Sequence, residues 1–185
     1  MNLIIAIAIG YLLGSIPFGL VFAKLFGYGD LRKVGSGNIG TTNAMRAGGI
    51  KLALLVLIFD AAKAFAAAYF FGIWAGLAAV VGHNYPIWLK FKGGKGLAAS
   101  AGFALAVAPI IVAICFPIWL IVALTFGYSS LGALVVLAVA PILGFVISTE
   151  IGLAFLGLAI LGYWRHRENI KRLLSGTESK IKWKK

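Results

Sequence analysis

The sequence predicts an all-α membrane protein with seven transmembrane helices, the N-terminus outside and the C-terminus in the cytoplasm. Hydrophobic residues make up 62% of the 185 residues and charged residues 12%, whereas soluble domains are nearer half apolar and a quarter charged. Lys and Arg outnumber Asp and Glu by 17 to 5 and lie mostly between or after the long apolar stretches. This composition excludes a soluble globular domain and also a disordered chain, which needs low hydrophobicity.

Three separate apolar stretches precede a longer apolar region. The three stretches lie at about 3–27, 51–71 and 73–89, and the longer region extends from 97 to 164. A transmembrane helix needs about 20 residues. Each of the first three stretches therefore predicts one transmembrane helix.

The region 97–164 is too long for two transmembrane helices and short for four. It is interrupted at Pro109, at 127–130 and at 148–150, where proline or polar residues occur. These interruptions divide it into four segments. We expect the first of them, 97–108, to be a short span that is tilted or incomplete.

The distribution of basic residues predicts the orientation, because Lys and Arg are enriched in cytoplasmic loops. They gather in the loop 28–50, in the loop 90–96 and from Arg165 onward, where eight of them lie. Two loops on the same side of a membrane must be separated by an even number of transmembrane helices. Two helices separate the basic loop 28–50 from the loop 90–96, and an even number must separate the loop 90–96 from the basic segment after Arg165. Four helices satisfy this condition and three do not, so all three basic segments are expected on the cytoplasmic side.

Composition also limits the partners. A net charge of +12 could suggest nucleic-acid binding, but the apolar stretches make membrane lipid the better partner, so no nucleic acid is expected. Cys115 is the only cysteine, which excludes a disulfide framework and a cysteine-based metal site. The first apolar stretch lacks a preceding basic segment and a cleavage site, and is expected to be retained.

We expect a single integral membrane domain over residues 1–185. Its end, 176–185, is short, polar and basic. We interpret this segment as a solvated cytoplasmic tail that is attracted to anionic lipids.

The loop 34–46, Val-Gly-Ser-Gly-Asn-Ile-Gly-Thr-Thr-Asn-Ala-Met-Arg, has the composition of an anion-binding site. Its glycines permit sharp turns and close approach of backbone N–H groups to a ligand, and a following helix N-terminus would add its positive end. Arg46 offers a bidentate fork suited to phosphate. The Gly-Lys-Ser/Thr ending of a Walker A loop is missing, and the alternative is an ordinary polar turn. The neutral donors are Ser36, Asn38, Thr41, Thr42 and Asn43.

A second cluster lies at 83–96, with the sequence His-Asn-Tyr-Pro-Ile-Trp-Leu-Lys-Phe-Lys-Gly-Gly-Lys-Gly. Lys95 stands between glycines and is interpreted as a phosphate ligand in a glycine-rich cradle. Lys90 and Lys92 are interpreted as basic residues of a cytoplasmic loop. His83 is expected to pack against an interfacial carbonyl rather than to act in catalysis.

The third cluster, 162–172, follows the last apolar segment and contains His166 and Asn169. On a continuing helix these two residues are three apart and share a face. Glu168 lies three residues after Arg165 and four before Arg172, so local charge pairing is its expected role. The alternative for His166 is an interfacial residue at a helix C-terminus.

Asp60 and Lys63 lie three residues apart within the second apolar stretch. Charged residues inside a membrane usually face the protein interior and pair with each other. A mutual ion pair is therefore expected. The alternative is that Lys63 reaches a ligand or that Asp60 orients a loop.

The three clusters are expected on one side of the membrane. They therefore predict a cytoplasm-facing pocket that is rich in hydrogen-bond donors able to bind phosphate. No Ser–His–acid order and no metal-ligand cluster can be justified from the spacing. The site is thus predicted either to transport an anionic solute or to catalyse a reaction of activated substrates, for which positioning and charge neutralisation suffice. A lipid-binding scaffold is a third, non-catalytic interpretation.

The three clusters, in this order and over essentially the whole chain, closely resemble the bacterial acyl-phosphate-dependent glycerol-3-phosphate acyltransferases. Acyl-CoA-dependent glycerophosphate acyltransferases instead carry a histidine followed by an aspartate five positions on. Here Trp88 follows His83 at that spacing and Lys171 follows His166. The hallmark of the acyl-CoA-dependent enzymes is therefore absent from both positions.

The resemblance implies transfer of a fatty acyl group from acyl phosphate to the 1-hydroxyl of glycerol 3-phosphate, giving lysophosphatidic acid and phosphate in phospholipid synthesis. It implies a bacterial cytoplasmic membrane, no cofactor and no obligate protein partner. Direct attack without an acyl-enzyme is the expected mechanism, with the phosphate of the donor or His166 as the base. The implied catalytic residues are Ser36, Arg46, Lys95, His166 and Asn169, and the implied substrate-binding residues are Gly37, Asn38, Gly40, Thr41, Gly93, Gly94 and Ser130.

Overall fold

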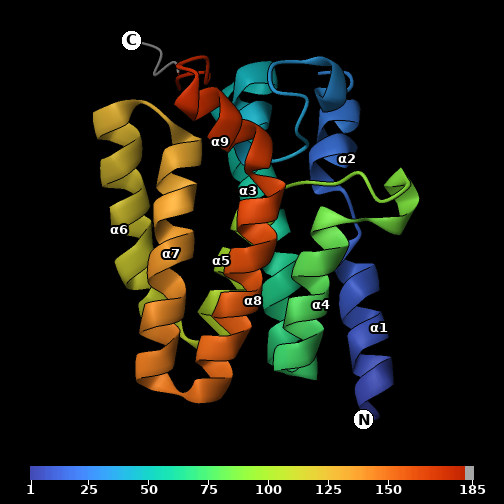
Figure 1. Ribbon diagram of the computed structural model, residues 1–185. Coiled ribbons are helices and arrows are strands. Elements are labelled where there is room, and N and C mark those ends of the chain that lie inside the picture. Colours follow the sequence, from blue (N-terminus) through green and yellow to red (C-terminus); the bar gives the residue numbers. More distant parts are fainter. Residues whose placement is uncertain (182–185) are drawn as a thin grey trace. The chain divides into compact units, whose positions relative to one another are not determined.

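The computed structural model describes residues 1–181, and all regular elements in this part of the chain are helices (Figure 1). The chain forms two compact units, Met1–Val107 and the remainder from Ala108. The first unit contains α1 (Leu3–Gly14), α2 (Phe18–Leu25), the 3-10 turn η1 (Leu31–Lys33), α3 (Thr41–Phe71), α4 (Ile73–Asn84), the 3-10 turn η2 (Ile87–Leu89) and α5 (Leu97–Val107).

The second unit is a series of helices that begin where the sequence predicts interruptions. Pro109 is the first residue of α6, where its fixed φ and missing N–H are tolerated. The polar segments near 127–130 and 148–150 separate the next helices, as expected. The four helices are α6 (Pro109–Phe126), α7 (Ser129–Ile147), α8 (Thr149–Arg165) and α9 (Arg167–Leu174).

Three segments are long and apolar enough to cross a membrane: Leu3–Leu25, Pro109–Phe126 and Ser129–Ile147. The helix α5 has 11 residues, which at about 1.5 Å per residue cover roughly half of a hydrocarbon core about 30 Å thick. The predicted short helix at 97–108 is therefore confirmed. The count of seven spans and their orientation stay predictions.

The first apolar stretch is not one continuous helix, which the sequence analysis missed. The helix α1 ends at Gly14, and α2 begins at Phe18. Pro17 lacks an N–H group and disfavours a helical conformation at Ile16. The Lys63 Nζ atom donates a hydrogen bond of 2.8 Å to the Ile16 carbonyl exposed by this break.

Two other helix ends differ from the expected boundaries. The helix α3 begins at Thr41, inside the first cluster, and is kinked at Gly49, whose φ of 73° lies in the left-handed region. The helix α4 ends at Asn84 rather than near 89, because Tyr85 precedes Pro86 and is disfavoured in the helical conformation. The single residue Gly72 separates α3 from α4, and the two helices pack as a hairpin.

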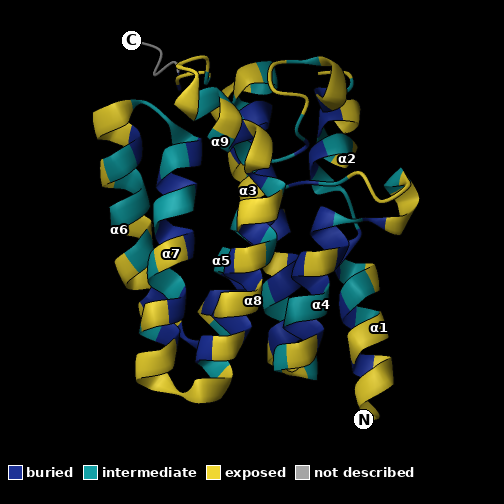
Figure 2. Cartoon of the chain, viewed as in Figure 1, coloured by how far each residue is buried: buried dark blue, intermediate teal, exposed yellow. Residues whose placement is uncertain are grey.

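Small residues allow the helices of the first unit to approach closely. Gly10 and Gly14 of α1 lie directly against the backbone of Ala75 and Ala79 in α4, so a Cβ atom at either glycine would overlap that backbone. Such contacts are typical of helix association in lipid. Exposed residues occur along the helices of both units (Figure 2), and many of them are large and apolar. This distribution suits a chain whose helices are solvated by lipid.

Candidate active site

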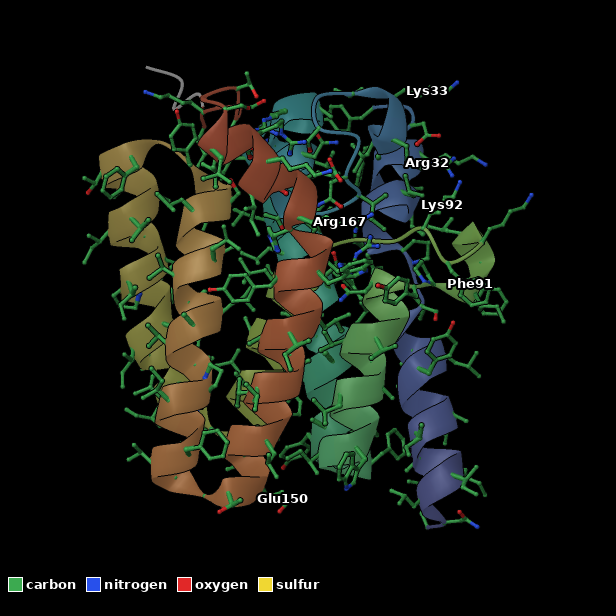
Figure 3. All side chains as sticks on the ribbon, viewed as in Figure 1. Arg32, Lys33, Phe91, Lys92, Glu150 and Arg167 are labelled. Carbon is green, nitrogen blue, oxygen red and sulfur yellow. The ribbon has the colours of Figure 1, made fainter. Side chains whose placement is uncertain are left out.

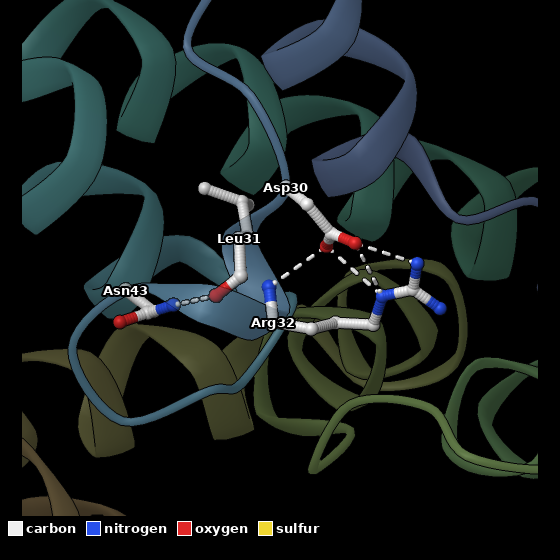
Figure 4. Close-up of polar contacts among 4 residues, drawn as sticks. All are labelled: Asp30, Leu31, Arg32 and Asn43. Carbon is white, nitrogen blue, oxygen red and sulfur yellow. Dashed lines mark hydrogen bonds and ion pairs between the residues drawn. The ribbon is translucent and has the colours of Figure 1, made fainter.

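The first cluster forms a glycine-rich turn that is held in place by the side chain of Asn43. Asn43 is 1% exposed. Its Oδ1 atom accepts a hydrogen bond of 3.0 Å from the Ser36 N–H. Its Nδ2 atom donates to the carbonyls of Leu31 at 2.8 Å and Asn38 at 2.7 Å. The Leu31 contact is drawn in Figure 4. Asn43 thus fixes the turn, a role that the sequence analysis did not assign to it.

Glycine is required where this turn reverses direction. Gly35 and Gly37 have φ values of 56° and 69°, which side-chain-bearing residues rarely adopt. A Cβ atom at Gly35 would also overlap the Asn43 side chain and lie 3.2 Å from Cδ of Arg46. Ser36, between these glycines, is exposed. Ser36, Gly37 and Asn38 therefore lie in this turn, whereas Thr41 and Arg46 belong to α3.

The turn leads directly into the N-terminus of α3, as predicted. Gly40 is the N-cap residue and has an extended conformation, and its carbonyl accepts from the N–H groups of Asn43 and Ala44. Thr41 is the first helical residue. Its Oγ1 atom is buried and has no hydrogen-bond partner in residues 1–181. A buried hydroxyl without a partner at a helix N-terminus suits a bound anion.

Arg32, near this turn, is already paired. Its guanidinium contacts the Asp30 carboxylate, with Nη2 at 2.6 Å from Oδ2 and Nε at 2.9 Å from Oδ1 (Figure 4). Side-chain and backbone hydrogen bonds from Arg32 lower the pKa of Asp30 to about 2. Asp30 therefore stays ionised over the physiological range. Arg46, within the cluster, is the better candidate for a phosphate ligand.

The second cluster follows the end of α4, in the same compact unit as the first cluster. Figure 3 labels Lys33, which precedes the first turn, and Lys92 of the second cluster, both in the upper half of the view. The Gly93 N–H donates to the Asn84 carbonyl at 3.1 Å, and the Gly94 N–H donates to the His83 carbonyl at 3.0 Å. These bonds fix the turn that contains Lys95, which is half-buried.

The buried charges of the first unit form one cluster. The Asp60 Oδ1 atom lies 2.9 Å from Lys63 Nζ and 3.4 Å from His83 Nδ1. The predicted Asp60–Lys63 pair is therefore confirmed. His83 is 4% exposed, which confirms that this histidine is packed. Its pairing with Asp60 was not anticipated.

In the second unit the chain does not continue as one helix through the third cluster, so that expectation is wrong. The helix α8 ends at Arg165, α9 begins at Arg167, and His166 between them has φ and ψ of −97° and 5°. The His166 Nδ1 atom lies 2.8 Å from the Gly162 carbonyl. A carbonyl can only accept, so Nδ1 carries the proton, and in the neutral ring Nε2 is the acceptor.

Three polar side chains of the second unit converge on Glu178. The Oε1 atom accepts from Ser130 Oγ at 2.8 Å and from Asn169 Nδ2 at 2.7 Å, and Oε2 accepts from Arg172 Nε at 2.7 Å. Burial raises the pKa of Glu178, but the hydrogen bonds from Asn169, Ser130 and Arg172 outweigh it and hold the pKa below its usual value. Glu178 thus joins two predicted site residues and stays ionised.

The expectation of a fully solvated tail is consequently wrong for the described part of that segment. Glu178 is largely buried, the Ile181 N–H donates to the Gly127 carbonyl at 2.8 Å, and Ile181 is 8% exposed. A hydrogen-bonded carboxylate and an apolar side chain are what anchor the tail. The remainder of the predicted tail, 182–185, lies outside the described residues. The only available signal was Glu178 itself, the single acidic residue after Glu168.

Glu168 pairs locally, as expected, but with other partners. Its Oε1 atom lies 3.5 Å from Lys171 Nζ and 3.7 Å from Arg167 Nε, on exposed side chains. Arg172, one of its expected partners, pairs with Glu178 instead. Such exposed pairs contribute little to stability. Glu168 therefore has no structural link to the buried residues of this cluster.

The predicted site residues fall into two sets. The first unit holds those of the two glycine-rich clusters, and the second holds the rest. Within residues 1–181 no group of three His, Cys, Asp or Glu side chains could hold a metal ion. The first set is Ser36, Gly37, Asn38, Gly40, Thr41, Arg46, Gly93, Gly94 and Lys95, and the second is Ser130, His166 and Asn169.

The chain is similar to known proteins over almost its whole length. A sequence model of the family described as glycerol-3-phosphate acyltransferase matches residues 4–176. A glycerol-3-phosphate acyltransferase of Rhizobium etli is 50% identical over 185 residues, covering 95% of this chain and 90% of the relative. One of Rhodospirillum rubrum is 50% identical over 194 residues, covering 95% and 89%.

Solved structures are similar over almost the whole chain. The crystal structure of PlsY, an integral membrane glycerol 3-phosphate acyltransferase, in its glycerol 3-phosphate form has a TM-score of 0.89 and 41% identity, covering 96% of this chain and 94% of that one. Its lysophosphatidic acid form has a TM-score of 0.88 and 39% identity, with the same coverage. The chain therefore belongs to the glycerol-3-phosphate acyltransferase family of integral membrane proteins.

Proposed function

We propose that this protein transfers a fatty acyl group from acyl phosphate to the 1-hydroxyl of sn-glycerol 3-phosphate, giving lysophosphatidic acid and phosphate. The observation that carries the proposal is the pair of hydrogen-bonded glycine-rich turns within the first unit, in a chain of this family. Both substrates carry phosphate, and both turns have the composition of phosphate cradles. Related structures in glycerol 3-phosphate and lysophosphatidic acid forms support the acceptor and the product.

The first turn suits a phosphate monoester through its backbone and side chains. Thr41 offers a buried hydroxyl at the start of α3, where the helix dipole favours negative charge. Arg46 supplies a bidentate cation, and Ser36 an exposed hydroxyl. In the second turn Lys95 adds one positive charge. These groups would offset much of the roughly three to four negative charges of the two substrates.

The chemical step that we propose is direct transfer. The 1-hydroxyl oxygen attacks the acyl carbonyl carbon, a new ester bond forms, and the bond from that carbon to the phosphate oxygen breaks. The hydroxyl proton passes either to the departing phosphate or to Nε2 of His166, whose acceptor role is favoured by the Nδ1 contact with Gly162. Acyl phosphate is an activated donor, so the protein need only position and neutralise the reactants.

The reaction is tested with purified protein in a lipidic environment, using labelled glycerol 3-phosphate with palmitoyl phosphate or palmitoyl-CoA. We expect labelled lysophosphatidic acid only from palmitoyl phosphate. Product from palmitoyl-CoA alone would overturn the donor. A covalently acylated protein isolated during turnover would overturn direct transfer. Uptake of glycerol 3-phosphate into liposomes without product formation would favour a transporter instead.

The base is tested separately with His166→Gln. If the histidine is the base, this variant loses most of its turnover. Retention of most of the turnover would assign proton acceptance to the phosphate of the donor. Arg165→Gln, at the adjacent position, serves as a control for loss of a polar side chain near the helix break.

We also propose a single integral domain of seven spans in the bacterial cytoplasmic membrane, with the site facing the cytoplasm. The segregation of basic residues supports this orientation. Because Cys115 is the only cysteine, Cys115→Ala provides a background for single-cysteine labelling. We expect Lys92→Cys to react only from the cytoplasmic side and Glu150→Cys only from the outside. Reaction of both from one side would refute the orientation.

A further inference from the structure

We propose that Asp60, Lys63 and His83 form a buried positioning network that holds the turn 93–95 in its phosphate-binding conformation. The inference rests on the proposed function, because it assigns phosphate binding to Lys95. It adds three residues that act on the substrate only through the turn. The network residues come from the two helices of the α3–α4 hairpin.

The network is an ionic cluster inside an apolar helix pair. Asp60, Lys63 and His83 are 1%, 5% and 4% exposed. The Asp60 Oδ1 atom lies 2.9 Å from Lys63 Nζ and 3.4 Å from His83 Nδ1. Burying charges costs more than burying apolar side chains of similar volume. Charged residues within membrane helices are therefore candidates for a functional role.

His83 connects this cluster to the second turn. The Nδ1 atom on one edge of its ring lies near Asp60, and the Nε2 atom on the opposite edge lies against Gly94. A Cβ atom at Gly94 would overlap Nε2 and lie 2.9 Å from both Cδ2 and Cε1 of the ring. The Gly94 N–H also donates to the His83 carbonyl at 3.0 Å. The orientation of His83 thus determines where the residue before Lys95 can lie.

Lys63 links the same cluster to the break between α1 and α2. Its Nζ atom donates to the Ile16 carbonyl at 2.8 Å while contacting Asp60. The Tyr11 hydroxyl of α1 also donates to the Tyr85 carbonyl at 2.8 Å, directly after Asn84, whose carbonyl accepts from the Gly93 N–H. The position of Lys95 is therefore coupled to three helices through buried polar contacts.

This geometry assigns positioning rather than catalysis to the network. His83 is 4% exposed, and its Nε2 edge lies against Gly94. The side chains of Asp60 and Lys63 are 1% and 3% exposed. None of the three can contact a substrate without rearrangement of the turn itself.

The test compares the double variant Asp60→Asn/Lys63→Met with the unmodified protein. Removing both charges leaves no unpaired buried ion but also removes the hydrogen bond from Lys63 to the Ile16 carbonyl, so the variant is expected to fold with a lower Tm. Without the Asp60 carboxylate, His83 loses its charged partner. We expect about a tenfold rise in KM for one of the two substrates, the factor that corresponds to one hydrogen bond to a charged group, with kcat little changed. Lys51→Met, on an exposed side chain of α3, should leave both KM values unchanged.

Unchanged KM values in the folded double variant would overturn the inference. So would a lower Vmax in proportion to the amount of folded protein, because that result indicates a purely structural role. If the double variant does not fold, Gly94→Ala tests the same contact from the turn. Its methyl group displaces Gly94 from His83, and we expect the KM of the same substrate to rise; an unchanged KM would again refute the network.

Calorimetric binding of inorganic phosphate separates this inference from the proposed reaction. We expect the double variant to bind phosphate about tenfold more weakly than the unmodified protein. This result supports the network even if no lysophosphatidic acid forms from palmitoyl phosphate, which would refute only the reaction. Equal phosphate affinity in the two folded proteins would overturn the network even if the reaction is confirmed.

Discussion

The variant Glu178→Gln removes the charge on which Ser130, Asn169 and Arg172 converge. The amide retains one oxygen, which can still accept from Ser130 and Asn169 at the Oε1 position. Its NH2 group would then face Arg172 Nε, placing a donor against a donor at a contact of 2.7 Å. The substitution therefore costs the Arg172 contact and the charge assistance of the other two bonds.

The size of the effect follows from these contacts. A hydrogen bond to a charged group contributes about 1.5–3 kcal/mol. The Arg172 side chain is 38% exposed, so solvent screening favours the lower part of this range. A loss of about 2 kcal/mol in the free energy of unfolding corresponds to a fall in Tm of about 4–8 °C for a chain of this size.

Thermal unfolding in a fixed detergent, followed by circular dichroism, measures this shift. Glu168→Gln is the matched control, because Glu168 makes only exposed pairs at 3.5 and 3.7 Å and the same chemical change should leave Tm within about 1 °C. If Glu178→Gln also left Tm unchanged, the buried hydrogen-bonded carboxylate would not stabilise the second unit and the reasoning would be refuted.

Four further predictions follow from particular contacts. The depressed pKa of Glu178 means that its stabilisation is present above the ordinary value of 4.5 and is lost as the pH falls through the folded-state pKa; Tm should decline less on acidification in Glu178→Gln. Asn43→Leu removes three hydrogen bonds to the backbone of residues 31–38 and should lower the free energy of unfolding by about 2–4 kcal/mol, measured by denaturation; an unchanged midpoint would contradict this. Thr41→Val removes a hydroxyl without a protein partner, so Tm should be maintained while the KM of a phosphate substrate rises about tenfold in steady-state kinetics. Gly14→Val places side-chain atoms into the backbone of Ala79 and should abolish recovery of folded protein on size-exclusion chromatography, whereas Gly157→Ala, with open space at its Cα, should not.

The sequence by itself determined the features that depend on neighbouring residues. The helix starts at Pro109 and near 127–130 and 148–150 follow from local backbone chemistry, and the short helix α5 follows from the distance between interruptions. The turn 34–40 before α3 follows from its glycines. The Asp60–Lys63 pair follows from a spacing of three residues on a helix. The three sequence clusters were sufficient to predict the family to which the chain belongs.

Tertiary structure decided the features that join residues distant in the sequence. His83 becomes the partner of Asp60 only because α3 and α4 pack as a hairpin. Glu178 becomes the partner of Ser130 only because the chain after α9 returns to the start of α7. The break at 15–17 was missed because apolar residues flank it on both sides, and the Ile16 carbonyl at this break accepts a hydrogen bond from Lys63, 47 residues away. Hydrophobic patterning places helices in lipid, but lipid cannot satisfy polar groups, so their partners are chosen by helix packing.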